Sequence, residues 1–315
     1  MSPNFYNVNA TELAQQYLSK TFDEVHQSWF QFLPSIIENP NARILDLGAG
    51  SGRDAKYLAE LAAKTHSTKN NIQIIAAEPA KELSQLGQKT TQGLNVKWLE
   101  DSLPALNNVT KQEVSFDLIL LSAVWMHIPP SDRARSIRKL ANLLKPGGKL
   151  VISLRHGQTD EECKQRKMHH VCAGELKQLA TAKIRENLTK NQYNNKLYRL
   201  YSKGAYPNHW HFDKNIELVP DLILEALPPA TFVKENYNLR FSSKGTHGYD
   251  AVSQKDLMGI FIATGPDIVK GKEIKAFENI HVFPFMSGIL SIKQPETIDG
   301  KHEVLASYIK NNQNN

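Results

Sequence analysis

The apolar positions in the first half of the chain follow two periods that alternate, and they predict a repeating order of strands and helices. Apolar runs predict strands at about 43–47, 72–77, 95–99, 116–122 and 148–154. Amphipathic patterns predict helices at about 52–63, 80–88 and 131–144, and the last meets Lys145-Pro-Gly-Gly148, a common helix stop. Strands that are apolar throughout belong in a parallel sheet covered on both faces. The pattern therefore predicts an α/β fold with a doubly wound, mostly parallel sheet, in which ligands gather at the carboxyl ends of the strands.

The segments before and after this repeat are predicted less regularly. Residues 9–38 read as one or two amphipathic helices that begin at Asn9 or Thr11 and extend up to Pro34. A further helix is expected near 173–185, followed by a polar stretch over 186–195. Because the character of the chain changes there, we expect one domain over 1–185 and a second region over 190–315.

The first strand ends on Asp46 and leads directly into a turn that contains Gly48, Ala49, Gly50 and Gly52. A turn with few Cβ atoms ahead of a helix N-terminus lets the backbone approach a ligand. Dinucleotide sites carry a third glycine where this chain has Arg53. A carboxylate ahead of the glycines suits a ligand with an ammonium and a sulfonium better than a pyrophosphate. Asp46 either orders that ammonium group, fixes the glycine loop, or caps the helix that follows.

The next two strand ends also carry polar side chains. Glu78 ends the second strand and precedes Pro79, and its two carboxylate oxygens suit the two hydroxyls of a ribose. The alternative is a carboxylate at a helix N-terminus, with Pro79 in the first helical position. After the third strand, Asp101 and Ser102 either accept a hydrogen bond from the exocyclic amine of an adenine or form a simple turn.

The fourth strand is followed by Ser122 and, five residues later, by His127. Ser122 belongs to the backbone expected to form the floor of the site beside the reactive centre. His127 is the candidate catalytic residue, as a general base or as a group that orients the acceptor. A histidine in an apolar segment is also commonly a packed, hydrogen-bonded wall, so this alternative stays open.

Together these segments resemble the class I S-adenosylmethionine-dependent methyltransferases, which have a Rossmann-like fold. The resemblance covers about residues 5–185, and its matching elements are Leu45-Asp-Leu-Gly-Ala-Gly-Ser-Gly52, Ala77-Glu-Pro79, Trp98-Leu-Glu-Asp101, Phe116 to His127, and Leu144 to Ser153. It implies S-adenosyl-L-methionine as the cofactor, whose sulfonium carries an electrophilic methyl group. It also implies that the protein chiefly positions the acceptor in line, without a metal or a covalent nucleophile.

The last third of the chain resembles a different family. Gly245-Thr-His-Gly-Tyr-Asp250, Met258 to Pro266 and Phe277 to Phe283 are similar to the carboxyl-terminal part of type I phosphodiesterases and nucleotide pyrophosphatases, which have the alkaline phosphatase fold. In that family the histidine at the position of His247 is a zinc ligand. The earlier metal ligands and the nucleophile are absent upstream of residue 190, so we expect no metal centre and no phosphodiesterase activity.

The methyltransferase pattern lacks the closing β-hairpin that such folds add. We therefore expect strands near 218–224 and 257–264 to complete or extend the sheet, or to form a small α+β lobe against it. An apolar helix pattern over 279–291 would then cover one face.

Composition and charge narrow the class of protein further. The net charge of +6 equals the excess within residues 161–203, where ten Lys or Arg face four Glu. This segment either attracts nucleic acid or another acidic partner, or forms a solvated helix surface. No aromatic or glycine-rich nucleic-acid-binding motif accompanies it, which favours the solvated surface. Cys163 and Cys172 do not form a zinc or disulfide pattern. No apolar run is long enough for a membrane span and no signal peptide is evident, so a cytoplasmic location is expected.

Three accounts of function follow. The leading one is an S-adenosylmethionine-dependent methyltransferase, with a small-molecule or macromolecular acceptor that the sequence leaves open. The second is a non-catalytic protein that binds the cofactor or a partner. The third is a phosphodiesterase remnant that lacks most of its metal site.

Overall fold

The computed structural model describes residues 3–65, 71–156, 158–233 and 249–310. The chain divides into two compact units, Met1–Phe232 and Val233–Asn315. Each unit is described by itself below.

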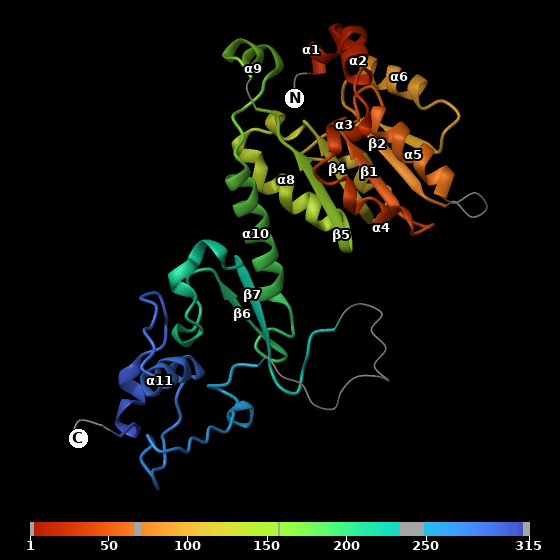
Figure 1. Ribbon diagram of the computed structural model, residues 1–315. Coiled ribbons are helices and arrows are strands. Elements are labelled where there is room, and N and C mark those ends of the chain that lie inside the picture. The colour runs from red at the N-terminus through yellow and green to blue at the C-terminus, as the bar shows by residue number, and fades with distance from the viewer. Residues whose placement is uncertain (1–2, 66–70, 157, 234–248, 311–315) are drawn as a thin grey trace. The chain divides into compact units, whose positions relative to one another are not determined.

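The first unit is built on a parallel sheet of five strands (Figure 1) in the order β3-β2-β1-β4-β5. The strands are β1 (Arg43–Leu47), β2 (Gln73–Ala77), β3 (Val96–Leu99), β4 (Phe116–Ser122) and β5 (Leu144–Ser153). All five had been predicted from their apolar runs. The Rossmann-like fold expected for this part of the chain is therefore confirmed.

Side chains of the central strands alternate between two apolar layers, one on each face of the sheet. Ile44, Leu118 and Leu120 pack on one face against α5 (Arg53–Thr65), whereas Leu45 and Ile119 pack on the other against α8 (Pro130–Leu143). Each of these five side chains is fully buried. Two-sided burial explains why the strands are apolar throughout, and it holds the strand tips in fixed positions.

Shorter helices connect the remaining strands. They are α6 (Lys81–Thr90), between β2 and β3, and α7 (Asn107–Thr110), between β3 and β4. α8 and β5 differ slightly from their predicted bounds. β5 begins at Leu144, four residues earlier than expected, because Leu144 pairs with Phe116 before a shift in register.

The N-terminal segment is more broken than predicted. Residues 9–38 contain α2 (Ala10–Leu18), α3 (Phe22–His26) and α4 (Pro34–Ile37) instead of one or two helices, and α1 (Pro3–Val8) precedes them. Thr21 starts α3 through a capping box with Glu24, and Pro34 begins α4, although the apolar stripe was expected to stop there. Tyr6, Leu13 and Leu83 of α6 share a small apolar cluster, which places α1 and α2 beside the carboxyl end of the sheet.

The first unit ends with an α+β extension. It contains α9 (Asp160–Arg166), α10 (Ala173–Lys190), and an antiparallel pair formed by β6 (Tyr198–Ser202) and β7 (Leu222–Ala226). The α+β extension of the predicted fold class is thus present. Of the two alternatives given for residues 218–224, extension of the parallel sheet is wrong, because β7 pairs with β6 in a separate sheet of two strands.

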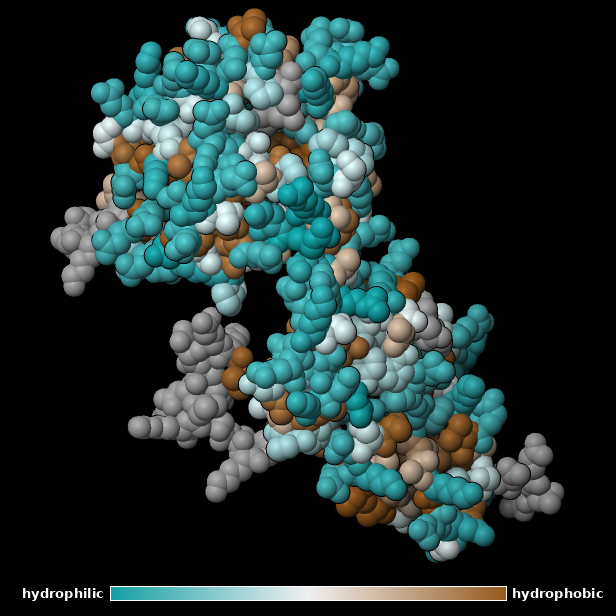
Figure 2. Space-filling view, turned by 180° about the vertical axis from the view of Figure 1, so that it is seen from behind, coloured by the Kyte–Doolittle hydropathy of each residue, from teal (hydrophilic) through white to brown (hydrophobic). Residues whose placement is uncertain are grey.

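In the second unit the structure describes Val233 and residues 249–310, which contain α11 (Val282–Ile289) inside the apolar pattern predicted at 279–291. Residues 257–264 form no strand, contrary to expectation. Figure 2 shows apolar side chains at the surface of the molecule. In this unit Met258, Ile260 and Ile262 are exposed. Across the described parts of both units, no helix combines the length and the apolar character that a membrane crossing requires.

Candidate active site

The turn after β1 is shaped by its glycines. Gly48 has φ +75°, and a Cβ atom there would lie 2.4 Å from Cγ2 of Val124. The amides of Gly48 and Ala49 both donate to the carbonyl of Ala77, at 2.8 and 3.1 Å, which ties the turn to the end of β2. At Gly50, with φ +54°, an added Cβ atom would come to 3.5 Å from the ring of Tyr17. The turn therefore lies between Val124 and Tyr17 with no room for a side chain at Gly48.

Glu78 joins this turn to the tip of β2. Its Oε2 accepts from the Gly50 amide at 3.0 Å, and its Oε1 accepts from the Ala80 amide at 2.9 Å. Burial raises the pKa of Glu78 to about 7, although both amides oppose the shift. Each oxygen retains a second lone pair for a ligand. Glu78 thus lies at the ligand cavity and accepts a hydrogen bond from Ala80, the N-cap of α6. The expectation that Pro79 holds the first helical position is wrong, because α6 begins at Lys81.

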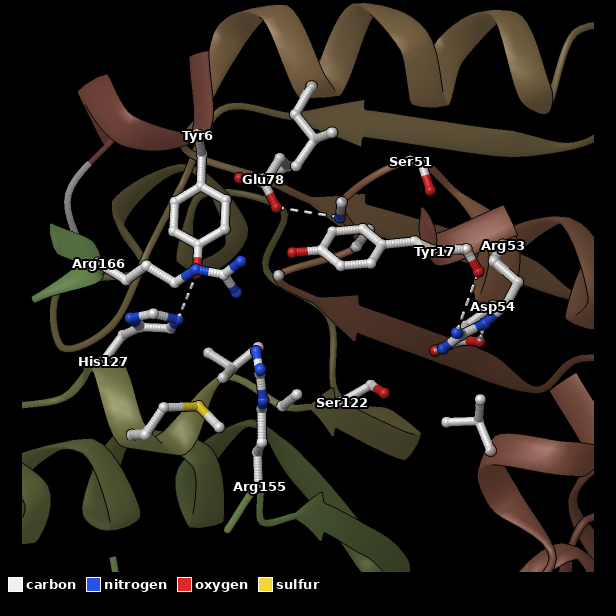
Figure 3. A pocket seen from close by; sticks show the side chains of 18 of the residues that line it. Tyr6, Tyr17, Ser51, Arg53, Asp54, Glu78, Ser122, His127, Arg155 and Arg166 are labelled. Atoms are coloured by element: carbon white, nitrogen blue, oxygen red, sulfur yellow. Dashed lines mark hydrogen bonds and ion pairs between the residues drawn. The ribbon is translucent and has the colours of Figure 1, made fainter. Parts of the chain in front are cut away.

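A cavity of about 220 Å³ lies at the carboxyl ends of β1 and β4 (Figure 3). Six of the predicted site residues line it: Gly48, Ala49, Gly50, Glu78, Ser122 and His127. Ser51 lies in the same wall and is buried. In the described part of the chain, the Ser51 hydroxyl has no hydrogen-bond partner, so it is available to a ligand.

Tyr6 and His127 form one end of this cavity (Figure 3). The Tyr6 hydroxyl lies 2.9 Å from Nε2 of His127, and the two rings meet edge to face with centroids 5.5 Å apart. Burial lowers the pKa of His127 to about 4 and raises the pKa of Tyr6 far above its usual value. The pair is therefore an uncharged hydrogen-bonding group at neutral pH.

The opposite side of the cavity carries a buried polar network. Arg53 forks onto Asp54 through Nε at 2.6 Å and a terminal nitrogen at 2.9 Å, and His26 Nε2 lies 3.0 Å from the same carboxylate. Trp29 Nε1 donates to His26 Nδ1 at 3.0 Å. Because an indole only donates, Nδ1 is unprotonated and Nε2 carries the proton that His26 gives to Asp54. Burial alone would raise the pKa of Asp54, but the hydrogen bonds from His26 and Arg53 lower it.

Asp46 lies outside the walls of the cavity. It is 1% exposed and accepts a hydrogen bond from the backbone of Ala55, in the first turn of α5. Burial, together with the charge of Asp54, raises its pKa well above the usual range. This position matches the helix-capping alternative that the sequence left open for Asp46. Contact with a ligand's ammonium group stays a prediction.

The remaining three predicted residues, Pro79, Asp101 and Ser102, line a smaller cavity of about 20 Å³. It adjoins the first, since Gly48, Val124 and His127 line both. Asp101 accepts hydrogen bonds from the amides of Ser102 and Val109, at 2.9 and 2.8 Å, as the turn alternative expected. The structure therefore brings nine of the ten predicted residues to two adjoining cavities.

Several lining residues were not predicted from the sequence, namely Tyr6, Tyr17, Ser51, Arg53, Asp54, Arg155 and Arg166. Arg155 follows the fifth strand, so the rule that located Glu78 and Ser122 also points to it. Ser51 lies within the glycine turn, and Arg53 and Asp54 come directly after it in the sequence, so the turn motif also points to them. The contributions of Tyr6, Tyr17 and Arg166 come from helices outside the strand–helix repeat, and no local signal marks them.

Comparison with known proteins identifies the class of this domain. Residues 44–148 match the family described as "Methyltransferase domain". These residues span β1 to the first half of β5, including the glycine turn, Glu78 and His127. The first unit therefore contains a methyltransferase domain, as the sequence motifs had indicated, and this match supports S-adenosyl-L-methionine as its cofactor.

Individual relatives come from both classes of protein that the sequence resembles. Arsenite methyltransferase of Rattus norvegicus is 30% identical over 148 residues, covering 44% of this chain and 39% of that protein. Ectonucleotide pyrophosphatase/phosphodiesterase family member 7 of Homo sapiens is 34% identical over 101 residues, covering 32% of this chain and 21% of that protein. Matches to this second class partly support the resemblance expected for the last third of the chain. The chain spans well under half of either relative.

Among solved structures, a TehB-like SAM-dependent methyltransferase from Corynebacterium glutamicum ATCC 13032 Kitasato is similar at 15% sequence identity. The match covers 61% of this chain and 86% of that one, with a TM-score of 0.35.

Proposed function

We propose that the two adjoining cavities bind S-adenosyl-L-methionine and that the chain transfers its methyl group to an acceptor held beside Tyr6 and His127. The observation that carries this proposal is the arrangement around the larger cavity. A glycine turn, a buried strand-end carboxylate and the tip of β4 line one space, at the edge of a parallel sheet where ligands bind.

The residues present fit such a cofactor. Gly48 and Gly50 leave backbone atoms open to close approach, and Glu78 offers a carboxylate for a pair of hydroxyls. The Ser51 hydroxyl supplies a further polar contact. When bound, the cofactor supplies a sulfonium methyl group, to which the acceptor's lone pair bonds as the carbon–sulfur bond breaks and leaves S-adenosylhomocysteine.

The role of His127 follows from its protonation. A base whose pKa is about 4 takes up a proton poorly at neutral pH, so general-base catalysis by His127 is disfavoured. Its contact with the Tyr6 hydroxyl instead fixes a rigid polar wall against which an acceptor is oriented. Orientation is the larger contribution when the methyl donor is already activated.

Calorimetry with S-adenosylhomocysteine tests the binding step. We expect micromolar binding by the full chain, a loss of at least about tenfold in Glu78→Ala, and no change in Glu82→Ala, which removes an exposed carboxylate from α6. Absence of binding in the folded wild-type chain, with zinc bound instead, would favour the phosphodiesterase alternative.

Turnover separates an enzyme from a non-catalytic binding protein. Formation of S-adenosylhomocysteine from S-adenosyl-L-methionine, measured across a panel of acceptors, is expected to depend on the acceptor added. Tight cofactor binding with no acceptor-dependent product across the panel would support the non-catalytic alternative.

A further inference from the structure

The larger cavity contains more positive charge than its own carboxylates balance. Arg53, Arg155 and Arg166 all line it. Arg53 is engaged by Asp54 through two hydrogen bonds. The Arg155 side chain donates from a terminal nitrogen to Glu162 Oε1 at 3.1 Å and is 41% exposed. No carboxylate in the described part of the chain pairs with Arg166, which lies over the ring of Phe5, 5.2 Å from its centroid.

Arg155 and Arg166 converge on the same space from different elements. Arg155 follows β5, and Arg166 ends α9. In Figure 3 both side chains extend into the region between Tyr6, His127 and Ser122. Both arginines are near the same two tyrosines, because the charges of Arg155 and Arg166 each act to lower the pKa of Tyr6 and of Tyr17. The two guanidinium groups therefore lie close to the end of the cavity assigned to the acceptor.

A cofactor with a sulfonium, an ammonium and one carboxylate adds a net positive charge to this cavity. Two arginines beside it are electrostatically unfavourable unless a further anion is present. Glu78 supplies only part of that charge, because burial raises its pKa to about 7. Guanidinium forks match the paired oxygens of carboxylates and of tetrahedral oxyanions such as phosphate, which they bind through paired hydrogen bonds.

We propose that Arg155 and Arg166 form an anion subsite for the methyl acceptor, so that this chain acts on an acceptor carrying an oxyanion group. The inference rests on the proposed function and specifies its substrate class. The capping box of Thr159 and Glu162 starts the helix that ends at Arg166, and Glu162 also holds Arg155, so α9 positions both groups.

Sulfate binding to the protein saturated with S-adenosylhomocysteine tests the subsite, because the carboxylate of that product already occupies its own position. The titration uses sodium sulfate, with sodium chloride keeping the ionic strength constant, and calorimetry as the readout. We expect one saturable sulfate site in the wild-type chain, weakened at least about tenfold in Arg155→Gln and in Arg166→Gln. Arg155→Lys keeps the charge but loses the guanidinium fork, so its sulfate affinity is expected to lie between that of the wild type and that of Arg155→Gln.

Arg138→Gln is the matched control, since it removes one positive charge from an exposed position on α8. It is expected to bind sulfate as the wild type does. The proposal is overturned if the product-loaded wild type shows no saturable sulfate binding, or if Arg138→Gln weakens it equally. It is also overturned if Arg155→Gln and Arg166→Gln lose affinity for S-adenosylhomocysteine but keep that for sulfate. A folded wild-type chain that fails to bind S-adenosylhomocysteine contradicts the proposed function instead.

Discussion

Two constraints at Gly48 both exclude a Cβ atom. Its φ of +75° disfavours any side chain, and Cγ2 of Val124 occupies the place of a Cβ atom. We expect Gly48→Ala to lower the free energy of unfolding by about 3 kcal/mol, the sum of backbone strain and steric overlap. Because the turn must shift to relieve the overlap, affinity for S-adenosylhomocysteine is expected to fall as well. Urea unfolding and calorimetry measure the two effects.

Gly93 provides the control for this experiment. Its φ is +80°, but an added Cβ atom would meet nothing within 4 Å. Gly93→Ala is therefore expected to cost only the backbone strain, about 1 kcal/mol, with no change in ligand affinity. Equal effects of the two substitutions would show that the contact with Val124 is unimportant.

Glu78 makes stability depend on pH. Its folded pKa of about 7 lies above the ordinary value of 4.5, so in this window the folded chain holds a proton that the unfolded chain releases. Stability therefore falls as the pH rises from about 4.5 to about 7, by on the order of 3 kcal/mol for a shift of this size. Glu78→Gln removes the titration.

The measurement is urea unfolding of the wild type and of Glu78→Gln at pH 5 and at pH 8. The other titrating groups are common to both proteins, so their difference isolates Glu78. We expect the variant to gain stability relative to the wild type at the higher pH. A difference that does not change with pH would contradict the raised pKa.

Some site residues could be predicted from the order of strands along the chain, whereas others are placed by the packing of helices. Glu78, Ser122 and His127 were predictable because parallel strands end at one edge of a sheet, so chain order alone brings their tips together. Tyr6 and Arg166 reach the same cavity through helix packing, which depends on tertiary contacts that no local pattern encodes. Asp46 illustrates the converse, since a strand-end position did not by itself decide whether the side chain faces the ligand or the next helix.

At the scale of elements, two helices begin with the same device. Thr21 starts α3 and Thr159 starts α9, each through a capping box with a glutamate three residues on. α9 buries no side chain and carries Arg166, whereas α3 contains the buried Phe22 and His26. Loss of the cap should therefore affect function in one helix and stability in the other.

We expect Thr159→Ala to weaken sulfate binding by up to about fivefold, equivalent to the loss of about 1 kcal/mol of helix stability, with little change in global unfolding. Thr21→Ala should lower the free energy of unfolding by about 1 kcal/mol and leave sulfate affinity unchanged. Calorimetry and urea unfolding on both variants check the pair. The reverse assignment of effects would show that α9 does not position the anion subsite.

Which elements were predictable also follows from packing. The five strands are buried on both faces, so their apolar runs are long and unambiguous. The N-terminal segment has one apolar stripe over 9–38, yet Thr21 and Pro34 each start a new helix within it, because local capping interrupts a pattern that periodicity alone extends. The pairing of β6 with β7 was missed, since an apolar run does not specify which strand it joins.

At the scale of the molecule, every residue that lines the two cavities lies between Tyr6 and Met168. The apolar layers on both faces of the sheet likewise draw only on residues of the first unit. The phosphodiesterase-like region therefore contributes no described side chain to the proposed cofactor site. His247, its candidate zinc ligand, lies outside the described residues.

A chain that ends at Phe232 tests whether the cofactor site depends on the second unit. This boundary keeps α10 and the β6–β7 pair, and it removes the residues from Val233 onward. We expect this shorter chain to unfold cooperatively and to bind S-adenosylhomocysteine with the affinity of the full chain, because it retains both apolar layers and the whole lining of the cavities. Calorimetry on both proteins decides the matter. A folded shorter chain that binds the ligand at least about tenfold more weakly would mean that residues 233–315 complete the site, and the methyltransferase and phosphodiesterase-like regions would then form one functional unit.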